Sequence, residues 1–259
     1  ITYNMNGTSR GEVRTITKTI RTQDYAKTIL NTSNLVGYFR LGEDSGTNAE
    51  DLSTTGNDGT YTNTPTQGAA GGLRGDLNPS TTFASGSLEY VEASDNAAYD
   101  FGTSDFAIEF WLNITSWPGS VQYLVSHGGN GDYDEWETRL DASVEGRFSS
   151  RIHTAGGVAI TVTSGSDSNF VESGWHHIAL VMDRDGNAQW YKDGATYGSA
   201  TDISSASTNE LNYVASLWIA RRTSALYLDG SMDEVAIYNK ALSASEISNH
   251  YNVGSTSLY

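Results

Sequence analysis

The sequence contains no cysteine, only three prolines, and 15 lysine and arginine residues against 31 aspartate and glutamate residues. Without cysteine there is no disulfide framework, so stability must come from a hydrophobic core, which 259 residues are enough to bury. The formal net charge of −16 argues against nucleic acid as a partner, because binding to phosphate depends on lysine and arginine.

No apolar run reaches the length of a membrane-spanning helix, so no membrane insertion is expected. The N-terminal residues also lack the apolar stretch of a signal peptide. Because the chain begins at Ile1 rather than Met, this does not define the compartment.

Short segments rich in aromatic and β-branched residues are present throughout the chain, and turn residues bound each of them. Phe106–Leu112 and His177–Val181 alternate apolar and polar positions, as half-buried strands do. Many short strands at regular spacing indicate an all-β sandwich or barrel. We predict strands at 35–41, 88–91, 106–112, 123–126, 175–181, 188–192, 217–220 and 232–238.

Two short helices are also expected. The later one begins at Ser243, which forms a capping box with Glu246, and Gly254 is its predicted stop signal. The earlier one covers about Gln23–Leu30 and places Tyr25 and Ile29 on one face. A helix of under three turns is unstable alone, so it must pack on the sandwich or on a partner.

Residues 1–21 differ from the rest in charge, with a net value of +3 that leaves −19 for the remaining chain. They are rich in β-branched residues and poor in turn formers, which indicates an extended arm, with a disordered terminus as the alternative. We therefore expect three parts: an arm over 1–21, a short helix and lead-in over 22–33, and a sandwich over 34–259. The basic residues expected to bind neighbouring subunits or a scaffold protein are Arg10, Arg14, Lys18 and Arg21.

Five segments resemble, in the same order, the strands of laminin G-like domains in the concanavalin A-like superfamily. The resemblance implies a two-sheet antiparallel jelly-roll sandwich, but it implies no reaction, because one fold supports many functions. The matching segments are Leu35–Glu43 with Asp51–Tyr61, Asp105–Trp111, Gly174–Val181, Trp190–Gly194 and Leu228–Ser243.

The residues that glycoside hydrolysis requires are missing. Hydrolases of this fold carry a Glu-x-Asp-x-x-Glu strand, and no such spacing occurs here; the nearest acidic cluster is Asp132–Glu137. A serine triad is not expected either, because the five histidines are best explained as structural or solvent-facing, and no Gly-x-Ser-x-Gly turn is present.

The resemblance suggests a structural calcium ion where the first loop meets the closing strand. The matching positions are Glu43, Asp51, Asn57 and Asp233, which supply oxygen ligands of the kind calcium prefers. The alternative is that Asp51 and Asn57 make Asx turns and that Asp233 caps a strand.

Aromatic residues offer platforms for a sugar. Trp111, Trp175, Trp190 and Trp218 lie in apolar strands and are expected in the core. Trp136, with Tyr133 and Asp134, is assigned to a loop and is the predicted glycan-stacking group. Arg221 and Arg222 form an isolated basic pair after a strand, expected to be solvated or to make a salt bridge.

The preferred interpretation is a non-enzymatic surface recognition or interaction module. It would be a structural, decoration or adhesion component of a phage virion or a bacterial surface assembly, located extracellularly or on the virion surface, with a cell-surface glycan as a candidate ligand. The alternative is a carbohydrate-binding module of a larger secreted glycoside hydrolase. Deletion of the arm distinguishes the two interpretations, because a binding module should tolerate its loss and an assembly subunit should not.

Overall fold

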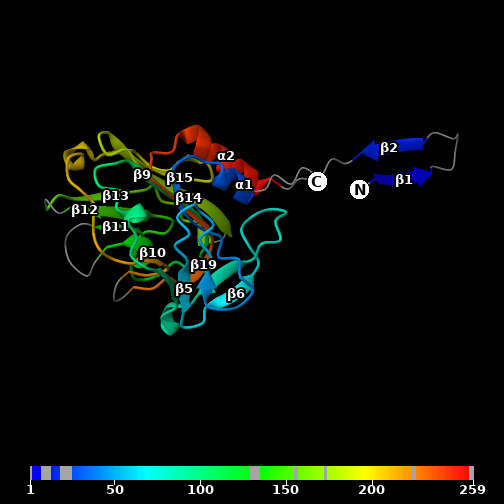
Figure 1. The fold of residues 1–259 in the computed structure, drawn as a ribbon, viewed down its shortest axis with the longest axis horizontal. Helices are drawn as coiled ribbons and strands as arrows, with labels where there is room; N and C mark the ends of the chain where they lie inside the picture. The colour runs from blue at the N-terminus through cyan, green and yellow to red at the C-terminus, as the bar shows by residue number, and fades with distance from the viewer. Residues whose placement is uncertain are drawn as a thin grey trace.

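The computed structural model describes residues 2–6, 13–17, 25–128, 135–154, 157–171, 174–222 and 226–256, with the backbone alone for 2–6, 13–17 and 135. Two antiparallel sheets pack face to face in a jelly-roll sandwich, and two helices lie on one outer surface (Figure 1). The predicted all-β sandwich with two short helices is therefore confirmed.

The larger sheet has nine strands, and most of its central strands are long. In spatial order its strands are β16 (Ala195–Thr196), β15 (Asn187–Lys192), β14 (Trp175–Met182), β9 (Phe106–Asn113), β19 (Gly230–Tyr238), β7 (Ser80–Phe83) and β6 (Thr66–Ala69), with β17 (Thr201–Asp202) beside β15 and β3 (Leu35–Phe39) beside β19.

The second sheet has eight strands and brings together segments far apart in the sequence. Its order is β13 (Ala159–Thr163), β12 (Phe148–His153), β11 (Glu135–Leu140), β10 (Gln122–His127), β18 (Leu217–Ile219), β8 (Tyr90–Ala93), β5 (Gly59–Thr62) and β4 (Asn48–Ala49). Three single-turn 3₁₀ helices lie in the described loops: η1 (Ser85–Ser87), η2 (Ala97–Tyr99) and η4 (Ser204–Ala206).

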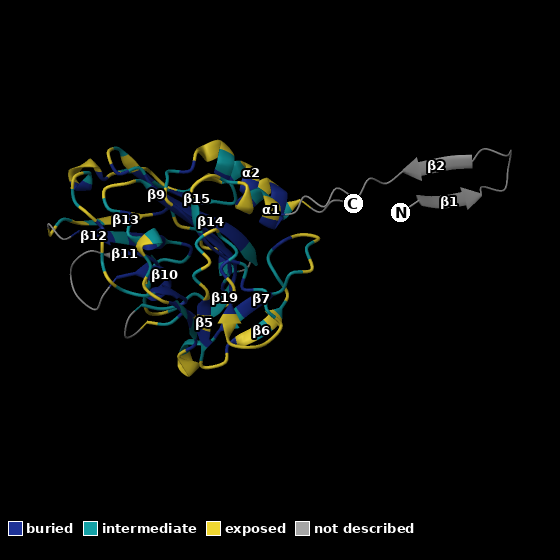
Figure 2. Cartoon of the chain, in the orientation of Figure 1, coloured by how far each residue is buried: buried dark blue, intermediate teal, exposed yellow. Residues whose placement is uncertain are grey.

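Strand β9 is buried on both faces, because the second sheet covers one face and the helices cover the other (Figure 2). Its side chains alternate, as the period of a strand requires. Ile108 and Phe110 pack in the core between the sheets, whereas Ala107 and Trp111 pack on the helix side.

The two helices, α1 (Tyr25–Leu30) and α2 (Ala244–Ser255), contact each other on the outer surface of the nine-stranded sheet (Figure 1). Both halves of the predicted capping box at Ser243 and Glu246 are present. The predicted stop at Gly254 is wrong, since the helix continues through Ser255. A Cβ at Gly254 would lie 2.6 Å from the Trp111 ring, so close packing explains this glycine.

The N-terminal arm contains two paired strands rather than one extended segment. Strands β1 (Thr2–Asn6) and β2 (Val13–Thr17) form an antiparallel ribbon and pair with no other described strand. Of the four predicted partner-binding residues, Arg10, Lys18 and Arg21 lie outside the described residues, and only the backbone of Arg14 is described.

Candidate functional site

The outer surface of the eight-stranded sheet carries polar and aromatic side chains at alternate positions of strands β8 and β18. In β8, Val91 and Ala93 point into the core, whereas Tyr90 and Glu92 occupy the alternate, outward positions. In β18, Leu217 and Ile219 belong to the core, so Trp218 lies on the outer surface, paired in register with Glu92 on one side and Ser126 on the other. We call this surface the open face, because both described α-helices lie on the other sheet.

An arginine stacked among aromatic rings occupies the middle of the open face. The chain turns at Ala220, whose φ of 69° ends strand β18. The guanidinium carbon of Arg221 then lies 4.1 Å from the centre of the Tyr90 ring, 5.4 Å from Tyr227 and 5.7 Å from Trp218. Each such contact is attractive, because a cation interacts with the negative face of a ring.

Trp218 has a polar atom that no described residue satisfies. Its side chain is almost fully buried against the sheet, and its Nε1–H has no hydrogen-bond acceptor among the described residues. A buried donor without an acceptor is costly, so such groups usually meet a water molecule or a ligand. Beside it, Glu92 accepts a hydrogen bond of 2.8 Å from the Ser216 hydroxyl.

A second group on the open face joins two arginines to one buried carboxylate. Glu137 lies 2.8 Å from Arg139 and 3.3 Å from Arg222, and Arg222 also lies over the Tyr123 ring at 5.6 Å. Two guanidinium groups therefore lie beside one carboxylate, and Glu137 forms an ion pair with each of them. A glycosidase instead requires two carboxylates on opposite sides of a sugar.

Trp136 is not the exposed platform predicted from the sequence. It lies in strand β11 opposite His127, is 1% exposed, and its Nε1 donates to the Tyr99 carbonyl at 3.2 Å. Burial lowers the pKa of His127 to about 4, so this ring is neutral at pH 7 and stacks on Trp136 as part of the core. Tyr133 and Asp134, the other two predicted glycan-binding residues, lie outside the described residues.

Three of the predicted calcium ligands, Glu43, Asp51 and Asp233, accept hydrogen bonds, although Asp233 Oδ1 has no partner among the described residues. Asp51 accepts from the backbone N–H groups of Ser53 and Asn57, each at 2.9 Å, as an Asx turn does. Glu43 accepts from the Tyr61 hydroxyl at 2.6 Å, and Asp233 accepts from the Gly72 N–H at 2.8 Å.

Within the described part of the chain, no three or more His, Cys, Asp or Glu side chains are arranged to hold a metal ion. Glu43, Asp51 and Asp233 are therefore not brought together as ligands, and calcium binding stays a prediction from the resemblance.

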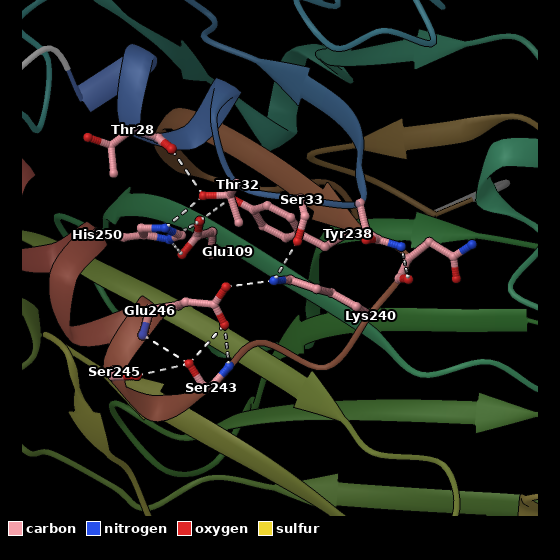
Figure 3. A network of polar contacts seen from close by, with 12 residues as sticks. Thr28, Thr32, Ser33, Glu109, Tyr238, Lys240, Ser243, Ser245, Glu246 and His250 are labelled. Carbon is pink, nitrogen blue, oxygen red and sulfur yellow. Dashed lines mark hydrogen bonds and ion pairs between the residues drawn. The ribbon is translucent and has the colours of Figure 1, made fainter.

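A hydroxyl, an imidazole and a carboxylate lie in line beneath the helices (Figure 3). Glu109 is fully buried in β9, and one of its oxygens lies 2.9 Å from His250 Nδ1. His250 Nε2 lies 3.1 Å from the Thr32 hydroxyl, which itself donates to the Thr28 carbonyl at 3.0 Å. The order of groups is that of a hydrolase triad, which the sequence did not reveal.

The direction of these hydrogen bonds argues against catalysis. The Thr32 hydroxyl donates its hydrogen to the Thr28 carbonyl, so its oxygen is left to accept a hydrogen bond from His250 Nε2, while His250 Nδ1 faces the Glu109 oxygens. Although burial opposes it, the charge of Glu109 and the hydrogen bond to it raise the pKa of His250 above its usual value. Both ring nitrogens of His250 are thus engaged, so the ring joins α2 and the segment after α1 to the sheet, and the Thr32 hydroxyl is directed at the Thr28 carbonyl rather than at a base.

Glu109 is the centre of this group, which we call the covered cluster: Glu109, Tyr238, His177 and His250. The Tyr238 hydroxyl donates to Glu109 at 2.5 Å, and His177 Nε2 lies at 3.1 Å. Burial alone would raise the pKa of Glu109, but the neighbouring histidines hold it well below the usual value. A buried carboxylate with this many donors stabilises the structure and is closed to a substrate.

Comparison with known proteins gives the fold a family. A family model described as the concanavalin A-like lectin/glucanases superfamily matches residues 85–248, which is more than half of the chain. No curated protein matches the sequence. No described helix is long and apolar enough to cross a membrane.

Several solved binding domains have a similar structure. The binding domain of Paraclostridial Mosquitocidal Protein 1 is 18% identical, with a TM-score of 0.67, and the match covers 85% of this chain and 52% of that one. The binding domain of Botulinum neurotoxin DC is 12% identical in its complex with rat synaptotagmin II (TM-score 0.63) and in its complex with SialylT (TM-score 0.64), with 85% of this chain and 51% of the other covered in each. The chain thus spans about half the length of these domains, and at these identities the likeness shows the fold.

Proposed function

Because this chain belongs to the concanavalin A-like lectin/glucanases superfamily, we propose that it is a non-enzymatic binding module whose open face recognises carbohydrate. The observation that carries the proposal is the buried Trp218 N–H, which has no acceptor among the described residues, beside two half-buried tyrosines and a stacked arginine. Aromatic rings pack on the apolar faces of sugars, and an orphan donor suits a sugar hydroxyl.

The solved neighbours support a binding role in general terms. They are binding domains, and one of them was solved in complex with rat synaptotagmin II and with SialylT. Those ligands belong to those proteins, and only the open face of this chain indicates what it binds. The Glu-x-Asp-x-x-Glu spacing of the hydrolases is absent from the sequence, which supports binding without hydrolysis.

A place on a virion or on a bacterial surface, facing the extracellular medium, fits this proposal. The basic N-terminal segment, of charge +3 against −19 for the rest, supports attachment to a neighbouring subunit or a scaffold protein. A carbohydrate-binding module within a larger secreted glycoside hydrolase would use the same open face, but it would not require the N-terminal segment.

The test is a glycan array followed by calorimetry on the best ligand. Replacing Arg221 with alanine, or Tyr90 with alanine, should weaken binding about tenfold, which corresponds to about 1.4 kcal/mol. Lys192→Ala is a matched control, because Lys192 lies over the Phe170 and Tyr197 rings at 5.8 and 5.6 Å, away from the open face. Equal losses in all three variants, or no glycan bound by the wild type, would contradict the proposal.

A further inference from the structure

The edges of the two sheets are protected in different ways. Strands β4, β16 and β17 are two residues long, and β6 has a register shift against β7. Along β3, the outer side is occupied by the chain at 51–52: Asp51 bridges Phe39, and the Leu52 N–H donates to the Tyr38 carbonyl at 2.9 Å. Short strands, bulges and covering segments are the usual protection against unwanted strand pairing.

Within the described part of the chain, strand β13 has none of these protections. It is five residues long, pairs with β12 without a register shift, and ends the eight-stranded sheet. Its sequence, Ala-Ile-Thr-Val-Thr, contains no charged residue and no proline. It is therefore a regular edge to which another strand can be added.

The hydrogen bonds identify which groups of β13 are free to pair. The Ser164 N–H donates to the Phe148 carbonyl at 2.9 Å, and the Thr154 N–H donates to the Val158 carbonyl at 3.0 Å. Because hydrogen-bonded and non-bonded pairs alternate in antiparallel strands, residues 160 and 162 also face β12. The N–H and C=O groups of Ala159, Thr161 and Thr163 then face the open edge, and all three residues are exposed.

The N-terminal ribbon also has strand edges that are unpaired among the described strands. Its strands β1 and β2 are also five residues long and pair only with each other among the described strands. A two-stranded ribbon is at best marginally stable alone in water, and each of its strands has an unpaired outer edge. The segment is basic, and the rest of the chain is strongly acidic.

We propose that the edge of β13 accepts the N-terminal ribbon of a second copy of this chain, so that the ribbon extends the eight-stranded sheet. Backbone hydrogen bonds would supply the affinity, and the opposite charges would steer the encounter. This interface is independent of the glycan proposal, because it uses the sheet edge rather than its outer surface.

The test separates acceptor and donor. Thr161→Pro removes an N–H that faces the open edge and leaves the bonds to β12 in place, whereas Thr161→Ala keeps that N–H and is the matched control. Deletion of residues 1–21 removes the donor. Light scattering with sedimentation velocity should show wild type and Thr161→Ala above the full-length monomer mass of 27.9 kDa. Thr161→Pro should run at that mass, and the truncated variant should run at its own, smaller monomer mass.

Mixing the two defective variants gives the sharpest result. The proline variant keeps a donor and the truncated variant keeps an acceptor, so an equimolar mixture should form a 1:1 complex. Circular dichroism of each variant alone verifies that it is folded. The proposal is overturned if the wild type is monomeric, if the truncated chain still self-associates through β13, or if the mixture stays monomeric.

Discussion

The two outer surfaces of the sandwich begin from the same strand alternation and end with different chemistry. On the nine-stranded sheet, helices α1 and α2 bury Glu109, and four hydrogen bonds from Tyr238, His177 and His250 surround it. On the eight-stranded sheet, the equivalent outward positions carry Tyr90 and Trp218 below a stacked Arg221. Covered polar groups must find partners within the protein, whereas the half-buried Tyr90 and Arg221 of the open face keep surface that a ligand can contact.

The largest difference in stability between the two outer surfaces is expected when the centre of the covered cluster is removed. Glu109→Ala leaves two buried histidines without their carboxylate, so we expect unfolding free energy to fall by about 3–5 kcal/mol. Denaturant titration measures this loss. The corresponding change on the open face, Glu92→Ala, should cost less than about 1 kcal/mol, because Glu92 is only half-buried and accepts one hydrogen bond, from Ser216. Equal losses at the two sites would remove the distinction between the faces.

Asp51, in a loop, is another buried carboxylate that accepts several hydrogen bonds. It accepts hydrogen bonds from the backbone N–H groups of Tyr38, Ser53 and Asn57, each at 2.9 Å, and it is 5% exposed. Asp51→Ala should therefore lower stability by about 2–3 kcal/mol. Thermal melting of the wild type with and without a chelator decides whether Asp51 serves only in the turn or also binds a metal. If Asp51 serves only in the turn, the two melting curves should be the same. If calcium is bound, the melting temperature should be lower with chelator.

A smaller effect is expected from pH on the covered side. The depressed pKa of Glu109 gives stability that is complete above its ordinary value of 4.5 and is lost as the pH falls through the folded value. The raised pKa of His250 gives stability that is complete below its ordinary value of 6.5 and is lost as the pH rises through the folded value.

The covered cluster should thus be most stabilising between pH 4.5 and 6.5. We expect the stabilisation that His250 contributes to be lost as the pH rises from there to 9. His250→Gln should flatten that decline, and Arg221→Ala should leave it unchanged. A decline that persists in the His250 variant would assign it to other groups.

Local patterns in the sequence predicted the fold well, because strand alternation and helix caps are local properties. The capping box at Ser243 depends on two residues three positions apart, and it is present. Trp136 was misassigned because the glycine-rich run before it suggested a loop, although Glu-Trp-Glu-Thr-Arg-Leu alternates as a strand does. The stop at Gly254 was wrong because its cause is packing on Trp111, which no local pattern shows.

The sites depend on contacts between distant residues, and these were not predictable. Glu109 and His250 are 141 positions apart. Trp218 stands in the segment Leu-Trp-Ile, where all three residues are apolar and alternation cannot indicate which one faces outward. Only the pairing of β18 with β8 and β10 places Trp218 on the open face and Arg221 over Tyr90.

The most direct measurement is the indole N–H region of a nitrogen–proton NMR spectrum, recorded while the best array glycan is added. The chain has six tryptophans, and the indoles of Trp117, Trp136 and Trp190 already donate to carbonyl groups. We predict that the Trp218 signal, assigned with Trp218→Phe, shifts on binding and that those three do not. A glycan that binds while the Trp218 signal stays fixed would contradict the open face as the binding site.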